Sequence, residues 1–146
     1  MWEDVFKEKR IADHLYYVSL KYTKTCDVIL NLIQRWVSLI DKCIEIILEK
    51  LKKEKSISSI PSAPFQRMSV IKDKMKRNKE VVEILEMYMM FKRIKNLKQN
   101  KEHEFRKGLA LVVYENGKEI KIDLEKLKEF NEKIENFLVF VKEFVN

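Results

Sequence analysis

The sequence predicts a mainly α-helical protein, a bundle of about five helices with one β-hairpin before the last helix. Three observations support this fold class. Glycine and proline occur only twice each in 146 residues, whereas β-sandwiches and barrels need frequent turn residues. Apolar residues recur at three- and four-residue spacing along most of the chain, as on one face of a helix. A single Asn-Gly pair separates two short β-type runs late in the sequence.

Composition bounds the class of protein. Hydrophobic residues make up 46% of the chain and charged residues 36%, which is the balance of a globular domain, and residues 1–146 are enough for one core. No apolar run approaches the roughly 20 residues that span a bilayer. The acidic N-terminus lacks the basic and apolar regions of a secretory signal. We therefore expect one cytoplasmic domain without membrane contact.

The N-terminal half predicts two helices. Residues on one face of the first are Val5, Ala12, Leu15, Ser19 and Tyr22. Thr23–Thr25 interrupts this pattern, and Thr25 is a good N-cap for the second helix, with Asp27 in its first turn. The second helix carries a very wide apolar stripe from Ile29 to Leu51. A stripe this wide predicts packing on more than one side, either at the centre of the bundle or in a homodimer.

Cys26 and Cys43 are both expected on the second helix. Their 17-residue separation corresponds to roughly 25 Å along a helix, too far for a disulfide. We expect both to be small buried apolar residues. With only two histidines in the chain, the sequence predicts no metal site and no cofactor.

The C-terminal half begins with a Ser- and Pro-rich linker, residues 56–64, where the chain must turn. A short helix is expected from about residue 65 to 76, and Asn78 can cap a fourth helix with an apolar face from Val81 to Ile94.

The hairpin and the last helix follow. Asn116-Gly117 lies between the two β-type runs and supplies the positive φ angles of a type I′ turn. A lone two-stranded hairpin is marginally stable in water, so we expect it to pack on the helices. Asp123 can cap the last helix, whose apolar seam runs from Leu127 to Phe144.

Positive charge is concentrated in two segments. The chain has a net charge of +7, and residues 67–79 and 92–107 each carry a net charge of +5. A surface built from both would attract a polyanion such as RNA; the alternative is a solvated Lys-rich face that serves solubility. The RNA prediction requires both segments to meet in one surface next to His103. The predicted nucleic-acid contacts are Arg67, Lys72, Lys76, Arg77, Lys92, Arg93, Lys98, Arg106 and Lys107.

Only one group of residues suggests catalysis. The chain has no Gly-rich phosphate loop, no G-x-S-x-G and no H-E-x-x-H. His103 could move protons near neutral pH, and neighbouring cations could stabilise a phosphate transition state. The candidate catalytic residues for a metal-free RNA cleavage are Arg93, Lys95, Asn96 and His103, with Arg106 beside them. The alternative is a solvent-exposed loop histidine.

The order of these segments resembles a known family. The long helical pair, the Ser/Pro loop, Arg93-Ile94-Lys95-Asn96-Leu97 and the following His103 resemble the HEPN superfamily of helical bundles, many of which are RNases or nucleotide-binding partners in toxin–antitoxin systems. Residues 12–18 and 104–107 are similar to segments of small archaeal proteins. Lys95-Asn96 stands where the HEPN motif has its catalytic Arg and polar residue, and the spacing to the histidine is longer. The resemblance therefore implies RNA or nucleotide binding without clear catalysis.

Three functions remain from the sequence. The first is a HEPN-like module that binds RNA or a nucleotide through the basic region. The second is a structural or protein-interaction module, which forms a homodimer through the second helix or binds a small protein partner. The third is a weak metal-independent RNase.

Overall fold

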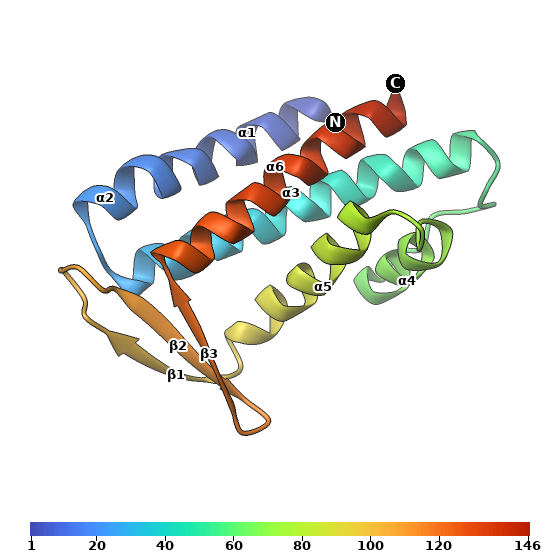
Figure 1. Ribbon diagram of the computed structural model, residues 1–146. Helices are drawn as coiled ribbons and strands as arrows, with labels where there is room; N and C mark the ends of the chain where they lie inside the picture. The colour runs from blue at the N-terminus through green and yellow to red at the C-terminus, as the bar shows by residue number, and fades with distance from the viewer.

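The computed structural model describes residues 1–146 and shows five helical rods and a three-stranded antiparallel sheet that precedes the last helix (Figure 1). This confirms the predicted mainly helical bundle. The helical elements are α1 (Trp2–His14), the π-helix η1 (Leu15–Ser19), α2 (Leu20–Tyr22), α3 (Cys26–Lys53), α4 (Pro64–Lys74), α5 (Lys79–Ile94) and α6 (Leu124–Val145). The strands are β1 (Lys98–Glu102), β2 (Ala110–Glu115) and β3 (Lys118–Asp123).

α3 is the centre of the bundle. α1, α4, α5, α6 and the strand β2 all pack against it (Figure 1), which explains why its apolar stripe is so wide. Fourteen of its residues are buried within the single chain, among them both free cysteines, as predicted. The homodimer through this helix stays a prediction.

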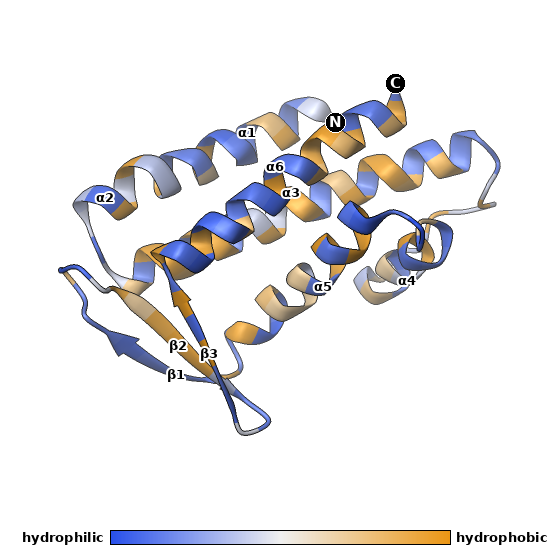
Figure 2. Cartoon of the chain, in the orientation of Figure 1, coloured by the Kyte–Doolittle hydropathy of each residue, from blue (hydrophilic) through white to orange (hydrophobic).

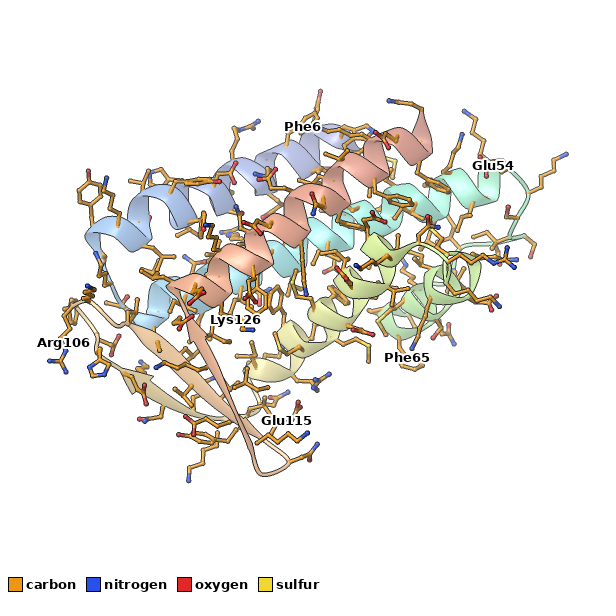
Figure 3. All side chains as sticks on the ribbon, viewed as in Figure 1. Phe6, Glu54, Phe65, Arg106, Glu115 and Lys126 are labelled. Carbon is orange, nitrogen blue, oxygen red and sulfur yellow. The ribbon has the colours of Figure 1, made fainter.

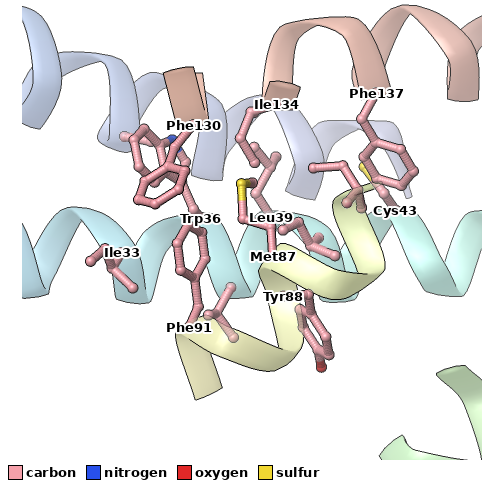
Figure 4. Close-up of a cluster of buried hydrophobic side chains, with 14 of the residues drawn as sticks. Ile33, Trp36, Leu39, Cys43, Met87, Tyr88, Phe91, Phe130, Ile134 and Phe137 are labelled. Carbon is pink, nitrogen blue, oxygen red and sulfur yellow. The ribbon is translucent and has the colours of Figure 1, made fainter. Parts of the chain in front are cut away.

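Aromatic rings join three of the helices at the middle of the core. Figure 4 shows Trp36 of α3, Phe91 of α5 and Phe130 of α6 gathered in one cluster, in which the two phenylalanine rings also meet edge-on with centroids 5.1 Å apart. The Trp36 and Phe91 rings stack with centroids 5.9 Å apart, and Phe130 meets Trp36 edge-on at 6.4 Å. Offset-stacked and edge-on arrangements are the favourable ones for aromatic quadrupoles, so this cluster helps to set the spacing of α3, α5 and α6.

Helix ends follow the local sequence. The Thr25 side chain accepts a hydrogen bond from the Val28 backbone N–H at 3.3 Å, and Asp123 accepts one from Lys126 at 2.8 Å. Both predicted N-caps are therefore confirmed. Asn78 occupies the N-cap position of α5, but its side chain forms no capping hydrogen bond.

The first helical rod, residues 2–22, differs from the prediction in which residues it buries. Its backbone stays helical from α1 through η1 and α2, but the turn widens to a π-helix from Leu15 to Ser19. A π-helical turn changes the number of residues per turn and so rotates the residues that follow. Tyr22, which we expected on the buried face, is consequently 78% exposed, and Leu20 is buried in that part of the rod.

The sheet contains the predicted hairpin and one strand more. Asn116 and Gly117 have φ angles of 51° and 75°, the positive pair that a type I′ turn requires. β1 pairs antiparallel with the other edge of β2, from Lys98 opposite Tyr114 to Glu102 opposite Ala110. The sequence therefore predicted the two strands of the hairpin and missed the third strand, β1. The missed strand is hydrophilic, whereas β2 is largely hydrophobic (Figure 2), so β1 has no alternation or β-branched signal, and β2 supplies its hydrogen-bonding partner.

The helices are too short or too polar to span a membrane. None of them combines the length and the apolar character needed to cross a bilayer.

Candidate nucleic-acid interface

β1 divides the second basic segment between two ends of the sheet. Arg93 pairs with Glu115 beside the hairpin turn, whereas His103 follows Glu102, which pairs with Ala110 at the other end. A five-residue strand covers roughly 16 Å. The structure therefore does not bring His103 to the catalytic candidates near Arg93.

Lys95 and Asn96 lie at the same end of β1 as Arg93. Both are exposed in the turn between α5 and β1, on the far side of that strand from His103. The predicted catalytic set is thus divided, because residues 98–102 between its members form the strand β1.

His103 has a single partner from the candidate set. Its Nδ1 accepts a hydrogen bond from the Arg106 guanidinium at 2.9 Å. The side chain is exposed, its φ is +53°, and its ring lies over Gly108, where an added Cβ would be 3.5 Å from it. This is the exposed loop histidine that we named as the alternative.

The loop around His103 is fastened to the start of α3. The Glu104 carboxylate accepts a hydrogen bond from the Cys26 N–H at 2.9 Å, and the Phe105 N–H donates to the Lys24 carbonyl at 2.6 Å. The neighbouring Arg106 and Lys107 are exposed at this end of the molecule.

The first basic segment lies much farther along α3. Arg67 and Lys92 line a hollow together with Asp41, and Asp41 is 15 residues beyond Cys26, a distance of roughly 22 Å along the helix. Figure 3 shows Arg106 and Phe65 at opposite ends of the molecule. The single basic surface next to His103 that the RNA prediction required is therefore not formed.

The two basic segments do meet over a smaller area, where α4 lies against the end of α5. We call it the α4–α5 surface. Its central hollow of about 250 Å³ is lined by Pro64, Phe65, Met68, Tyr88, Met89, Lys92 and Arg93, and we include the adjacent Arg67 and Lys72. Thus the first segment meets the beginning of the second. Lys76 and Arg77 are exposed in the turn after α4, and Lys98 is exposed at the start of β1.

Phe65 is the unusual residue of the α4–α5 surface. It is 70% exposed, although phenylalanine is among the residues most often buried. Lys72 is seven residues further along α4, which is close to two helical turns, so it lies on the same face as Phe65. An exposed ring and a cation therefore share one side of the helix.

The cations of this surface are mostly without carboxylate partners. Among the nine predicted contacts, only Arg93 forms an ion pair, with its Nε 2.6 Å from a Glu115 oxygen. This hydrogen bond from the guanidinium lowers the pKa of Glu115 below its ordinary value. Arg67 donates from Nε to the Pro61 carbonyl at 2.7 Å. That bond positions Arg67 but leaves its charge uncompensated.

Lys92 is held by Tyr88. Its ammonium donates to the Tyr88 hydroxyl oxygen at 3.2 Å and lies 5.1 Å from the centre of the same ring. The Tyr88 hydroxyl in turn donates to the Asp41 carboxylate. Burial, and then this carboxylate, raise the pKa of Tyr88 well above its ordinary value. The neutral phenol therefore links Asp41 to Lys92 and orients the lysine.

Sequence reasoning could not single out Phe65, Tyr88 or Asp41. The basic segments contain or border several aromatic residues, and their sequence does not separate the exposed Phe65 from the buried Phe91. Asp41 is 47 residues from Tyr88, so no local pattern could pair them.

Neither the comparisons with known proteins nor the arrangement of possible metal ligands assigns a function to this chain. No protein-family model matches the chain, and neither a curated protein sequence nor a solved structure matches it. No group of three His, Cys, Asp or Glu side chains is arranged to hold a metal ion. The resemblance to HEPN proteins stays a prediction, and the α4–α5 surface is the feature from which a function can be inferred.

Proposed function

We propose that this chain binds single-stranded RNA through the α4–α5 surface, which is smaller than the basic surface that the sequence predicted and does not include His103. The observation that carries the proposal is the exposed ring of Phe65, which lines one hollow with Lys92 and lies on the same helix face as Lys72. Neither lysine forms an ion pair with a carboxylate of the chain, and Lys92 also lines the neighbouring hollow with Arg67. Proteins that bind single strands combine cations that contact the backbone with aromatic rings on which bases stack.

Each part of the surface has a separate task. A base stacked on Phe65 contributes about 1–3 kcal/mol. Lys92 and Arg67 neutralise phosphates and release counterions. The contacts with Tyr88 and the Pro61 carbonyl hold these two side chains in place before the ligand arrives, which reduces the entropy cost of binding.

The proposal is limited to binding. His103 lies at the far end of β1 from Arg93 and close to α3's first turn, so its imidazole is not part of the α4–α5 surface. A HEPN-like relationship would agree with a binding role and forms part of the proposal as a resemblance only.

The test is a titration of a short labelled single-stranded RNA at low and moderate salt, followed by fluorescence anisotropy. We expect Phe65→Ala to weaken binding about fivefold or more through lost stacking. Lys92→Gln should weaken it and reduce the salt slope by about 0.7 for the phosphate no longer neutralised.

Two matched controls carry the same chemical changes elsewhere. Tyr22→Ala removes another exposed aromatic ring, and Lys7→Gln removes an exposed lysine of α1. Both should bind RNA like the unaltered chain. Absence of binding at low salt, or equal losses in the control variants, would contradict the proposal.

A further inference from the structure

A third hollow lies between α3, α5 and β1, next to the α4–α5 surface but on the other side of Lys92. We call it the α3–α5 pocket. Its volume is about 370 Å³, within the range of small-molecule sites. The apolar residues that line it are Leu30, Ile33, Val37, Phe91 and Ile94, and the polar ones are Gln34, Lys92, Lys95 and Gln99.

The apolar lining belongs to the core. Ile33, Val37, Phe91 and Ile94 are each at least 93% buried, so they form a fixed floor that does not have to reorganise for a ligand. Phe91 is further held by its stack on Trp36. A preformed apolar floor favours binding because little conformational entropy is lost.

The charged side chains that line the pocket are all positive. Lys92 and Lys95 are the only ionisable side chains around the pocket, and no carboxylate lines it. Neither lysine forms an ion pair with a residue of the chain. The Lys92 ammonium is held on Tyr88, which does not line the pocket, so Lys95 is the cation with which an anion in the pocket would form a charge-assisted contact.

We propose that the α3–α5 pocket binds a small organic anion with an aliphatic body, of which an alkyl carboxylate is the simplest example. The hydrocarbon lies on Ile33 and Val37, and the carboxylate lies beside Lys95. The Gln34 amide is exposed at the rim and can donate to the same head group. Gln99 is already committed through Nε2 to the Ile94 carbonyl at 2.9 Å.

The lining favours a hydrocarbon over a nucleic-acid base. Four of the five apolar side chains are aliphatic, whereas bases are held by exposed aromatic faces. Binding of an organic anion therefore goes beyond the proposed RNA binding and does not depend on it. The two sites share only Lys92, which lines both hollows.

The experiment titrates the full chain with straight-chain carboxylates of increasing length, below their micelle concentrations, by calorimetry. We expect affinity to rise about fourfold for each added methylene, the value for burying one CH₂, until the pocket is full. The matching alcohols should bind more weakly because they carry no charge.

Two variants locate the site. Lys95→Gln should weaken the carboxylates about tenfold, the value of a hydrogen bond to a charged group, and leave the alcohols unchanged. Val37→Phe should fill the pocket and abolish binding of both series, with its folding checked by circular dichroism. Lys7→Gln on α1 is the control for a lost positive charge and should change nothing.

Three outcomes would overturn the inference. They are no carboxylate binding, no dependence on chain length, and equal effects of Lys95→Gln and Lys7→Gln. Because Lys95 is exposed, its variant decides the matter even if Val37→Phe fails to fold. RNA titrations of Phe65→Ala test the α4–α5 surface separately, since Phe65 does not line the pocket.

Discussion

Glu104 caps a helix that begins 78 residues earlier in the chain. Its carboxylate accepts a hydrogen bond from the backbone N–H of Cys26, the first residue of α3, at 2.9 Å. The first N–H groups of a helix have no partner within the helix and carry partial positive charge. Thr25 caps the Val28 N–H, so a local and a distant residue share the task. The contact ties the sheet to the central helix.

Removing this distant cap should destabilise the protein. We expect Glu104→Ala to lower the free energy of unfolding by about 1 kcal/mol, the usual effect of losing an N-cap acceptor, measured by urea denaturation. Glu119→Ala is the control, because Glu119 is exposed on β3 and forms no ion pair or side-chain hydrogen bond. Equal losses in the two variants would show that the cap contributes nothing.

The hairpin turn should be sensitive to the loss of its glycine. Gly117 has a φ of +75°, a region that costs a residue with a Cβ about 1–2 kcal/mol. Gly117→Ala should therefore lower the free energy of unfolding, measured by urea denaturation, by about that amount. An added Cβ would meet no atom within 4 Å, so the loss would report backbone strain and not a clash. Unchanged stability would mean that the turn does not need this conformation.

Tyr88 predicts a loss of stability at high pH. Its pKa is raised in the folded protein, so the folded state holds the phenol proton more tightly than the unfolded state. The resulting stabilisation is complete below the ordinary tyrosine pKa of about 10 and is lost as pH rises from there toward the folded value. Urea denaturation from about pH 8 to about pH 11 would measure this decline.

Tyr88→Phe should flatten part of that pH dependence, because phenylalanine has no proton to lose. It also removes the hydrogen bond to Asp41 and the partner of Lys92, so stability near neutral pH should fall. Tyr22→Phe, at an exposed position, should retain the decline of the unaltered chain. A Tyr88→Phe variant with that same decline would refute the assignment.

Cys43 should be inert to thiol reagents in the folded protein. Burial raises its pKa to about 12 and leaves its side chain without exposed surface, and the thiolate is the reactive species. An aromatic disulfide reagent should therefore modify Cys43 only as the protein unfolds in urea. The Cys26→Ala variant isolates this signal. Rapid modification in buffer would contradict the buried position.

Local sequence predicted the elements whose stability depends on neighbours in the chain. Thr25 and Asp123 were recognisable as caps because a cap bonds to a residue three positions later. The Asn116-Gly117 turn was recognisable because its φ angles demand those residue types. Tyr22 was misplaced because periodicity assumes a constant helical turn, and the π-helix η1 departs from it.

The sequence by itself determined the helical class, the hairpin, the central apolar helix and the amount of positive charge, since these follow from periodicity, capping and composition. Only the tertiary structure decided where that charge lies. β1 has no apolar pattern and forms because β2 offers an edge, yet it separates His103 from Arg93. The Tyr88–Lys92 contact fixes a cation at the hollow that Phe65 also lines, while Asp41 and Glu104 act across 47 and 78 residues. Such contacts depend on packing in space, which no local spacing encodes.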